Sequence, residues 1–271
     1  MYPTTFHRAK TLEHASELFH QLDNASFLSG GHTLVPTMKQ GLASPTHLID
    51  LTGIESLVGI EREGDEILIG AATRHCVVAQ SPQVQAAIPA LAALVGSIGD
   101  RQVRFRGTIG GSLANNDPAA DYPAAVLGLG ATIVTNKRRL SAEDYFVGLF
   151  QTALEPGEVV VQVRFPIPKA AGYAKFRGAA ARYSVVGVWV SDCHEGVRVA
   201  ITGAGEQGVF RHAELERVLT HHFTPEAIQG VAIEGTGLLS DLNASAAYRA
   251  NLIKVLTGHA VGHMGGIVNL K

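Results

Sequence analysis

Residues 106–115 read RGTIGGSLAN, and this stretch decides how the rest of the chain is interpreted. It places three glycines, two hydroxyl side chains and an amide within ten positions. Glycine lets the backbone approach a ligand closely, and uncharged N–H and O–H donors suit phosphate or hydroxyl oxygens. Residues 116–121 (NDPAAD) follow with two acids and a proline in a tight bend, where the acids can accept hydrogen bonds from ligand hydroxyls.

Another glycine segment precedes it at residues 29–36, SGGHTLVP. The chain leaves an expected strand here and enters a short helical turn, and paired glycines allow positive φ. Successive N–H groups in such a turn form a concave anion site, to which Thr33 adds a hydroxyl. The combination suits a pyrophosphate without a lysine. Alone, either segment favours an ordinary tight turn, but two such loops about 77 residues apart (Gly30 to Gly107) favour one shared site.

The spacing of apolar residues predicts the elements that carry these loops. Residues 11–22 read as a helix capped by Thr11, and strands at 26–28 and 47–51 flank the first loop and a helical turn near 35–38. Residues 57–60 and 66–71 read as a hairpin, Thr73 as a helix cap, and Ser81-Pro82 as the start of a helix to about residue 95. Further strands are expected at 132–135 and 159–165, with a capping-box helix start at 141–144 between them.

Pro166 and Pro168 mark a predicted domain boundary. Beyond it, strands are expected at about 173–177, 185–190 and 197–202, and helices near 211–219, 225–231 and 245–258. No clear strand is expected after residue 220. Strands followed by helices predict a small α+β domain.

The composition excludes several classes of protein. With 22 basic and 24 acidic residues and a net charge of −2, nothing indicates a nucleic-acid-binding surface. The short cluster Lys137-Arg138-Arg139 is interpreted as a solvated turn. No apolar run could span a bilayer and no secretory signal is seen, which favours a cytoplasmic location. Only Cys76 and Cys193 are present, too few for an iron–sulfur cluster or a cysteine-rich zinc site.

Other patterns receive structural interpretations. Residues 203–208 match G-x-G-x-x-G after a strand, but too little parallel α/β sequence follows for a Rossmann sheet, so a turn is favoured. His259 and His263 are four residues apart, yet nearby glycines argue against a helix there and zinc needs further ligands. Trp189 is interpreted as core, Cys76 and Cys193 as ordinary small residues, and His32 as either a loop-packing residue or a ligand contact. No Ser-His-Asp set, Walker loop or paired-carboxylate motif is present.

Taken together, the loops resemble those of a known family. Residues 30–36 (GGHTLVP) resemble the first flavin loop of the FAD-binding subunits of molybdenum hydroxylases, and residues 102–114 (QVRFRGTIGGSLA) resemble the second. Residues 117–123 (DPAADYP) resemble the bend that follows. The group includes the medium subunit of carbon monoxide dehydrogenase and the FAD domains of xanthine, aldehyde and nicotine dehydrogenases. The resemblance runs from about residue 3 to residue 260 and is sharp only in the two loops.

The resemblance implies an α+β chain with an FAD-binding fold of the vanillyl-alcohol-oxidase type. Two α/β subdomains, at about residues 1–54 and 55–166, would hold FAD between them, and a C-terminal domain at 169–271 would close over the flavin. Both loops would approach the pyrophosphate and ribityl chain, with Lys175 and Tyr183 near the isoalloxazine ring. The implied cofactor-binding residues are Ser29, Gly30, Gly31, His32, Thr33, Leu34, Gly107, Thr108, Ile109, Gly110, Gly111, Ser112, Asn115, Asp117, Asp121, Lys175 and Tyr183.

The chain departs from the family pattern between Lys175 and Tyr183. Many relatives carry extra arginines and an aspartate here, whereas residues 178–182 of this chain read GAAAR. Arg182 thus replaces an acid, which bears on the exposed face of the flavin and on the choice of electron acceptor.

The implied function is electron transfer rather than complete catalysis. A flavin exchanges electrons singly or in pairs, so it can link iron–sulfur clusters to an acceptor such as NAD, quinone or oxygen. The resemblance supplies the partners: a small subunit with two 2Fe–2S clusters and a large molybdopterin subunit, in a heterotrimer doubled by symmetry. Two alternatives stay open. One is a self-contained FAD-dependent oxidase or dehydrogenase, which would need its own substrate pocket and proton acceptor. The other is a non-catalytic flavin-binding assembly protein.

Overall fold

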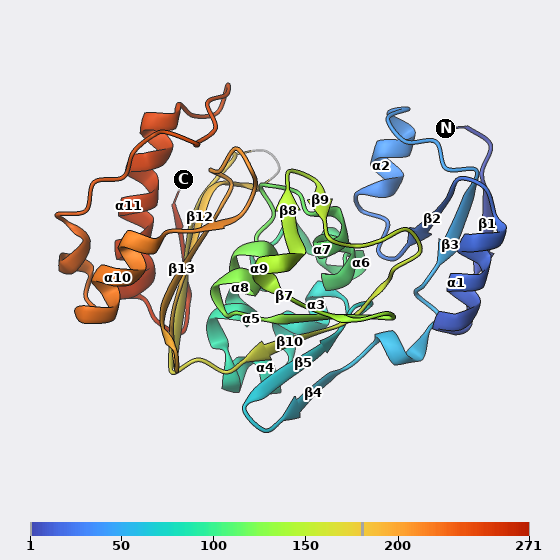
Figure 1. The fold of residues 1–271 in the computed structure, drawn as a ribbon, viewed down its shortest axis with the longest axis horizontal. Coiled ribbons are helices and arrows are strands. Elements are labelled where there is room, and N and C mark those ends of the chain that lie inside the picture. The colour runs from blue at the N-terminus through green and yellow to red at the C-terminus, as the bar shows by residue number, and fades with distance from the viewer. Residues whose placement is uncertain (1, 180–181, 271) are drawn as a thin grey trace.

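Three main β-sheets follow one another along the chain in the computed structural model, which describes residues 2–179 and 182–270. Figure 1 shows them side by side along the long axis, in chain order from the N-terminal end to the C-terminal end. Helices and strands are mixed throughout, as an α+β fold requires.

The first sheet is parallel and carries the first glycine loop. Its strands pair in the order β1–β3–β2 and are connected through two helices: β1 (Thr5–Arg8), α1 (Leu12–Gln21), β2 (Ala25–Leu28), α2 (Leu34–Lys39) and β3 (His47–Asp50). Thr11 caps α1 as predicted, because its side chain accepts a hydrogen bond from the N–H of His14. The loop follows the last residue of β2, so it lies at the carboxyl edge of the sheet, where open α/β sheets bind ligands.

The second sheet is antiparallel, with the order β4–β5–β10–β6–β7. Its strands are β4 (Ile60–Glu63), β5 (Glu66–Gly70), β6 (Thr132–Thr135), β7 (Arg139–Ser141) and β10 (Val160–Pro166). The predicted hairpin is present but begins later than expected, since Glu55–Leu57 forms a 3₁₀ turn (η1) before β4. A smaller hairpin, β8 (Phe146–Gly148) and β9 (Gln151–Thr152), projects beside this sheet.

Seven short helices belong to this unit in the described part of the chain: α3 (His75–Gln80), α4 (Pro82–Ala87), α5 (Pro89–Gly96), α6 (Arg101–Arg106), α7 (Ile109–Asn115), α8 (Tyr122–Gly128) and α9 (Ala142–Tyr145). Ser141 caps α9 as expected. The single helix expected from Ser81 to residue 95 was wrong: Pro89 forces Ile88 out of the helical region, to φ −138°, and the helix divides there. Thr73 is no cap either, since its hydroxyl hydrogen-bonds Gly59.

The third sheet has the order β14–β13–β12–β11–β15. Its elements are β11 (Ala170–Arg177), β12 (Ser184–Cys193), β13 (Gly196–Thr202), β14 (Phe210–Arg211), α10 (Ala213–His221), η2 (Pro225–Ile228), α11 (Ala246–Gly262) and β15 (Ile267–Leu270). The expectation of no strand after residue 220 was wrong, because β15 pairs in parallel with β11. Four residues at a sheet edge give little periodicity, so only the pairing with β11 defines this strand.

Both faces of the third sheet are covered. The helix α11 packs on one face, and α5 and α8 of the middle unit pack on the other (Figure 1). Trp189 is fully buried between them, as predicted for a core residue, and a Cβ on Gly128 of α8 would lie 2.3 Å from its ring. The proposed division into domains at residues 54/55 and 166/169 follows the limits of the three sheets and stays a prediction.

Replacement of Trp189 by alanine tests this shared core. We expect the free energy of unfolding to fall by about 3–5 kcal/mol, because a large ring is removed from a site with no room to collapse. Urea denaturation measures the change, with the fully exposed Leu242→Ala as the control, for which we expect less than about 0.5 kcal/mol. A loss below about 1 kcal/mol for Trp189→Ala would contradict the packing of the third sheet on α8.

Candidate functional site

The two glycine loops line one cavity of about 1090 Å³. This volume slightly exceeds the ~300–1,000 Å³ typical of small-molecule sites, as a ligand of dinucleotide size requires. All the residues predicted to bind the cofactor line it except Ile109 and Lys175. The fold therefore brings together side chains from all three sheet-bearing units.

The two loops touch where Gly30 meets Gly107. A Cβ on Gly30 would lie 2.4 Å from the carbonyl oxygen of Arg106 and 2.8 Å from the Cα of Gly107, so no other residue fits there. Beside this contact, the hydroxyls of Ser29 and Thr108 are hydrogen-bonded at 2.9 Å. Gly30 therefore serves first to let the two main chains approach each other.

The two loops differ in the hydrogen bonds that their N–H groups make. In the second loop, the N–H of Gly107 donates to Val103, that of Ile109 to Thr73 and that of Gly110 to Ala71. In the described part of the chain, the N–H groups of residues 30–34 have no protein acceptor. In the second loop only the N–H of Thr108 has no protein acceptor within the described residues, so most of the main-chain donors available to a ligand come from the first loop.

The second loop instead offers an open surface. Thr108 caps α7 by accepting from the N–H of Gly111, and Gly110 packs against Ala71. Gly111 is exposed and lines the cavity, and an added Cβ would lie 3.0 Å from Thr108 Oγ1 and 4.0 Å from the Cβ of Ser29, both side-chain atoms. The side chain of Ile109 points the other way and is buried in the core of the middle unit.

His75 is a cavity residue that sequence reasoning missed. It begins α3, its N–H donates to Gly107, and its Nε2 would lie 2.6 Å from a Cβ on Gly107. Its Nδ1 is buried without a hydrogen-bond partner in the described part of the chain. Burial, with smaller contributions from His32 and Arg104, lowers the pKa of the imidazole to about 4, so His75 is neutral at pH 7. Only its position before a short apolar run could have indicated it.

A pH dependence of stability follows from His75. The unfolded chain binds a proton at this residue below about pH 6.5 whereas the folded chain does so only near pH 4, so stability falls as the pH drops through this range. Between pH 7 and pH 5 the loss due to His75 should be about 2 kcal/mol. We expect His75→Gln to lose that much less than the wild type in urea denaturation at the two pH values. Equal losses in wild type and variant would be inconsistent with a buried neutral imidazole; the exposed His222→Gln is the control.

The bend after the second loop connects the cavity to the third sheet. Asn116 adopts a left-handed conformation and its amide donates to the carbonyls of Gly148 and Gln151, which fixes the β8–β9 hairpin. Asp117 lines the cavity, and burial raises the pKa of its carboxyl. The start of the bend is therefore attached to the β8–β9 hairpin through Asn116.

Asp121 ends the bend in a buried polar cluster. Its Oδ1 accepts from the hydroxyls of Tyr173 at 2.5 Å and Ser184 at 2.7 Å, and its Oδ2 accepts from the Lys175 ammonium at 2.9 Å. Lys175 is fully buried and does not line the cavity. Lys175 thus lies on the side of Asp121 away from the cavity and is the ion-pair partner of its carboxylate.

Removal of Lys175 tests how much the buried ion pair with Asp121 contributes to stability. Lys175→Met leaves the Asp121 carboxylate buried without its counter-ion, so we expect unfolding to become easier by about 3–5 kcal/mol. The double variant Asp121→Asn/Lys175→Met should recover part of the loss. Denaturation of both, compared with the half-exposed Lys169→Met, measures the difference. A Lys175→Met cost no larger than that of Lys169→Met would show that the pair is not buried in solution.

One end of the cavity is closed by residues of the third sheet. Tyr183 lines it with 48% of its surface exposed. Arg182 has a positive φ of 61° and donates from its guanidinium to the carbonyl of Gly99, in the turn before α6. Of the segment in which the chain departs from the family pattern, Ala180 and Ala181 lie outside the described residues.

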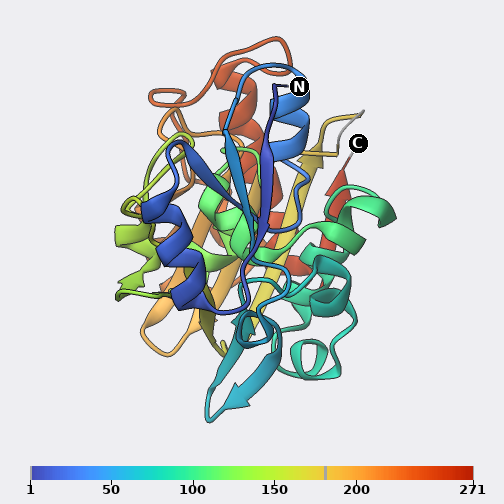
Figure 2. The same cartoon turned by 90° about the vertical axis from the view of Figure 1, so that its right-hand side faces the viewer.

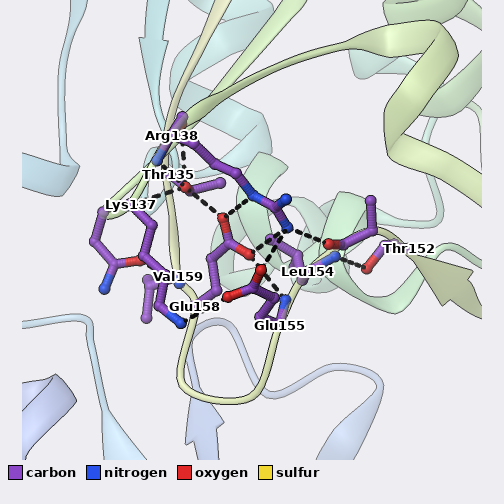
Figure 3. Close-up of polar contacts among 10 residues, drawn as sticks. Thr135, Lys137, Arg138, Thr152, Leu154, Glu155, Glu158 and Val159 are labelled. Atoms are coloured by element: carbon purple, nitrogen blue, oxygen red, sulfur yellow. Dashed lines mark hydrogen bonds and ion pairs between the residues drawn. The ribbon is translucent and has the colours of Figure 1, made fainter.

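The wall away from the third sheet was not predicted. There Phe27 stacks on Phe19 with ring centres 4.9 Å apart, and residues 154–160 complete the lining. Figure 3 shows what holds this segment in place: Glu158 forms a bidentate ion pair with Arg138 and accepts a hydrogen bond from the hydroxyl of Thr135. Burial alone would raise the pKa of Glu158, but these bonds and the N–H of Glu155 lower it to about 2. Arg138 lies in the exposed turn between β6 and β7, as expected, and in addition holds Glu158 in place.

Comparison with known proteins now identifies the family. Residues 2–168 match the family model described as the FAD binding domain in molybdopterin dehydrogenase. The chain belongs to this family. It is the FAD-binding medium subunit of a molybdenum hydroxylase, an oxidoreductase subunit with FAD as its cofactor. The vanillyl-alcohol-oxidase-type fold expected from the loops is confirmed.

Several relatives are similar over nearly their whole length. The carbon monoxide dehydrogenase medium chain of Hydrogenophaga pseudoflava is 35% identical, over 90% of this chain and 91% of that protein. The nicotine 6-hydroxylase medium subunit of Paenarthrobacter nicotinovorans is 31% identical, over 94% and 95%. A chain of the reconstituted CO dehydrogenase from Oligotropha carboxidovorans superposes with a TM-score of 0.88 at 32% identity, covering 97% of this chain and 98% of that one.

The G-x-G-x-x-G segment is a turn, as expected. It connects β13 to β14 in an antiparallel pair, and the N–H of Gly203 donates to Pro118 in the bend. His259 does lie on α11, contrary to the expectation that glycines would end the helix earlier. Within residues 2–179 and 182–270 no group of three or more His, Cys, Asp or Glu is placed to hold a metal ion. No helix in that part of the chain is long and apolar enough to cross a membrane.

Proposed function

We propose that FAD lies in the cavity between the glycine loops, with its pyrophosphate at the first loop and its isoalloxazine ring toward Tyr183. The observation that carries this proposal is the run of free main-chain donors at residues 30–34, placed beside the contact between the two loops. Such a run of N–H groups suits an anion without requiring a lysine or arginine.

The other residues present fit the cofactor. Ser29, Thr108 and Ser112 supply hydroxyls, Asn115 supplies an amide, and Asp117 supplies an acceptor for ribityl or ribose hydroxyls. His75 would add one imidazole nitrogen from beneath the second loop. Ile109 and Lys175 would act indirectly, through the position of the loop and of Asp121. The residues proposed to contact FAD are Ser29, Gly30, Gly31, His32, Thr33, Leu34, His75, Gly107, Thr108, Gly110, Gly111, Ser112, Asn115, Asp117, Asp121 and Tyr183.

The proposed role is electron transfer within a complex. Bound FAD supplies the exchange of one or two electrons, between 2Fe–2S clusters of a small partner subunit and an external acceptor such as NAD, quinone or oxygen. Substrate hydroxylation would take place in a separate molybdopterin subunit. Two cysteines cannot ligate a cluster here, which supports this division of labour. The printed names of the relatives, medium chain and medium subunit, support it as well.

Gly111→Val tests the location of the cofactor. Its side chain would enter the cavity without meeting protein backbone, so we expect FAD affinity to fall at least tenfold, about 1.4 kcal/mol, with little change in stability. The visible flavin absorption of the purified protein and the FAD released by acid measure binding. Gly230→Val is the matched control, because a Cβ at Gly230 meets nothing within 4 Å and lies away from the cavity. Full FAD content in Gly111→Val would place the cofactor elsewhere.

The purified chain tests the division of labour. Loaded with FAD but without partners, it should hydroxylate no substrate, and its flavin should be reduced only when a reduced 2Fe–2S subunit is added. Turnover by the lone chain would refute the proposal and support a self-contained dehydrogenase. FAD binding without reduction by the iron–sulfur subunit would also refute it and support an assembly protein.

A further inference from the structure

One of the carboxylates that line the cavity, that of Asp117, has no ion-pair partner. Five acidic residues of the described chain line the cavity: Asp100, Asp117, Asp121, Glu155 and Glu158. Three of them are ion-paired with lysine or arginine, and Asp100 caps α6. In the described part of the chain, Asp117 has neither an ion pair nor a helix to cap. Its carboxylate is therefore the lining acid that the fold leaves most available.

One oxygen of Asp117 is free to change its protonation. Oδ1 accepts a hydrogen bond from the N–H of Ala119 at 2.9 Å, within the bend. Oδ2 has no hydrogen-bond partner among the described residues. Burial raises the pKa of this carboxyl, against the opposing effect of the Ala119 N–H. A partly buried carboxyl with a free oxygen is a group that gains a proton when further negative charge comes close.

The bend places Asp117 at the end of the cavity that Tyr183 closes. The carbonyl of Ala119 accepts from the N–H of Ser184, the residue after Tyr183, at 3.2 Å. Burial raises the pKa of the Tyr183 phenol, and the charges of Asp117 and Asp121 raise it further. Figure 1 shows the green middle unit, which contains the bend, between the first and third sheets, and Figure 2 shows the same arrangement from the side of the first sheet.

We propose that Oδ2 of Asp117 takes up a proton when bound FAD is reduced and releases it when FAD is reoxidised. The site rests on the proposed function, because that function directs the isoalloxazine ring toward Tyr183 and hence toward Asp117. Near neutral pH a flavin gains two electrons but only one proton on reduction, so the ring acquires negative charge. Like charge disfavours an ionised carboxylate, so the pKa of Asp117 rises when the ring beside it is reduced.

The step balances in electrons and protons. Two electrons come from the reduced iron–sulfur donor, and one proton from water joins the ring. A second proton from water forms the O–H bond at Oδ2 of Asp117, which cancels the charge added to the site. On reoxidation the electrons and the ring proton leave the flavin, and the O–H bond breaks and returns its proton to water or to the acceptor.

The neighbouring groups leave this role to Asp117. Asp121 is already paired with the ammonium of Lys175 at 2.9 Å and accepts two hydroxyl hydrogen bonds. Tyr183 keeps its own proton, because its pKa is raised. Arg182 is the only arginine or lysine of the described chain that lines the cavity, and its guanidinium donates to a main-chain carbonyl. Protonation of Asp117 is thus the means of charge compensation that the cavity itself offers.

The midpoint potential of bound FAD, measured against pH on the full FAD-loaded chain with dithionite and mediator dyes, tests the proposal. Each proton taken up with two electrons changes the equilibrium tenfold per pH unit, which is about 30 mV. Over part of the range above neutral pH, we expect the wild-type slope to be steeper than that of Asp117→Asn by about this one-proton increment. Asparagine keeps an acceptor oxygen but cannot be protonated. Asp65→Asn, the same change at an exposed acid outside the cavity, should follow the wild type.

Infrared difference spectra of the wild type remove any dependence on variants. On reduction, the C=O stretch of a protonated carboxylic acid should appear and shift in heavy water, and it should be missing in Asp117→Asn. Equal slopes in wild type and Asp117→Asn, or no such band in the wild type, would overturn the proton site and leave the proposed function intact. Loss of FAD from Asp117→Asn without this band in the wild type would assign Asp117 to hydroxyl binding and also overturn the proton site. A wild-type chain that binds no FAD would overturn both proposals.

Discussion

The contact between Gly30 and Gly107 is the constraint on which the rest of the site depends. The two residues belong to units with different sheets, one parallel and one antiparallel, and the main chains approach too closely for any Cβ at Gly30. Most N–H groups of the second loop are hydrogen-bonded within the protein, whereas those of residues 30–34 have no protein acceptor among the described residues. Both the packing of the two loops and the binding of a ligand thus require glycine at position 30, so a substitution there would disturb both.

The bend from Asn116 to Asp121 extends this constraint to the third sheet. Asp121 lines the cavity, but both of its oxygens already accept hydrogen bonds from β11 and β12 side chains. A buried carboxylate is tolerated only with such partners, so the position of the C-terminal sheet is coupled to the shape of the loop. The residue therefore acts at the cavity mainly by holding the bend, while Asp117 keeps an oxygen for other acceptor roles.

The glycine loops could be predicted from the sequence because their composition is local. The other parts of the site could not, because they depend on packing between distant segments. A loop rich in glycine and hydroxyl residues can be recognised within ten positions, and nearly all the residues predicted from the two loops line the cavity. His75 and the wall at residues 154–160 carry no such local pattern, because their place depends on pairing between distant strands. Lys175 was placed by resemblance, and the structure sets it behind Asp121 instead of at the cavity surface. Strand β15 could not be predicted either, because it is defined by its pairing with β11.

The distribution of charge separates the two faces of the cavity wall. In the described part of the chain, Arg182 is the only arginine or lysine that lines the cavity. Of the lining acids, Asp121 and Glu158 are paired with Lys175 and Arg138, and Asp100 caps α6. An anionic group inside would meet neutral donors, which bind it at short range without the desolvation cost of a buried cation. Arg101 and Arg106 of α6 are exposed and do not line the cavity, whereas Val103 of the same helix does. The same short helix therefore presents an uncharged side chain to the cavity and charged side chains to water, which keeps cationic groups of α6 out of the cofactor site.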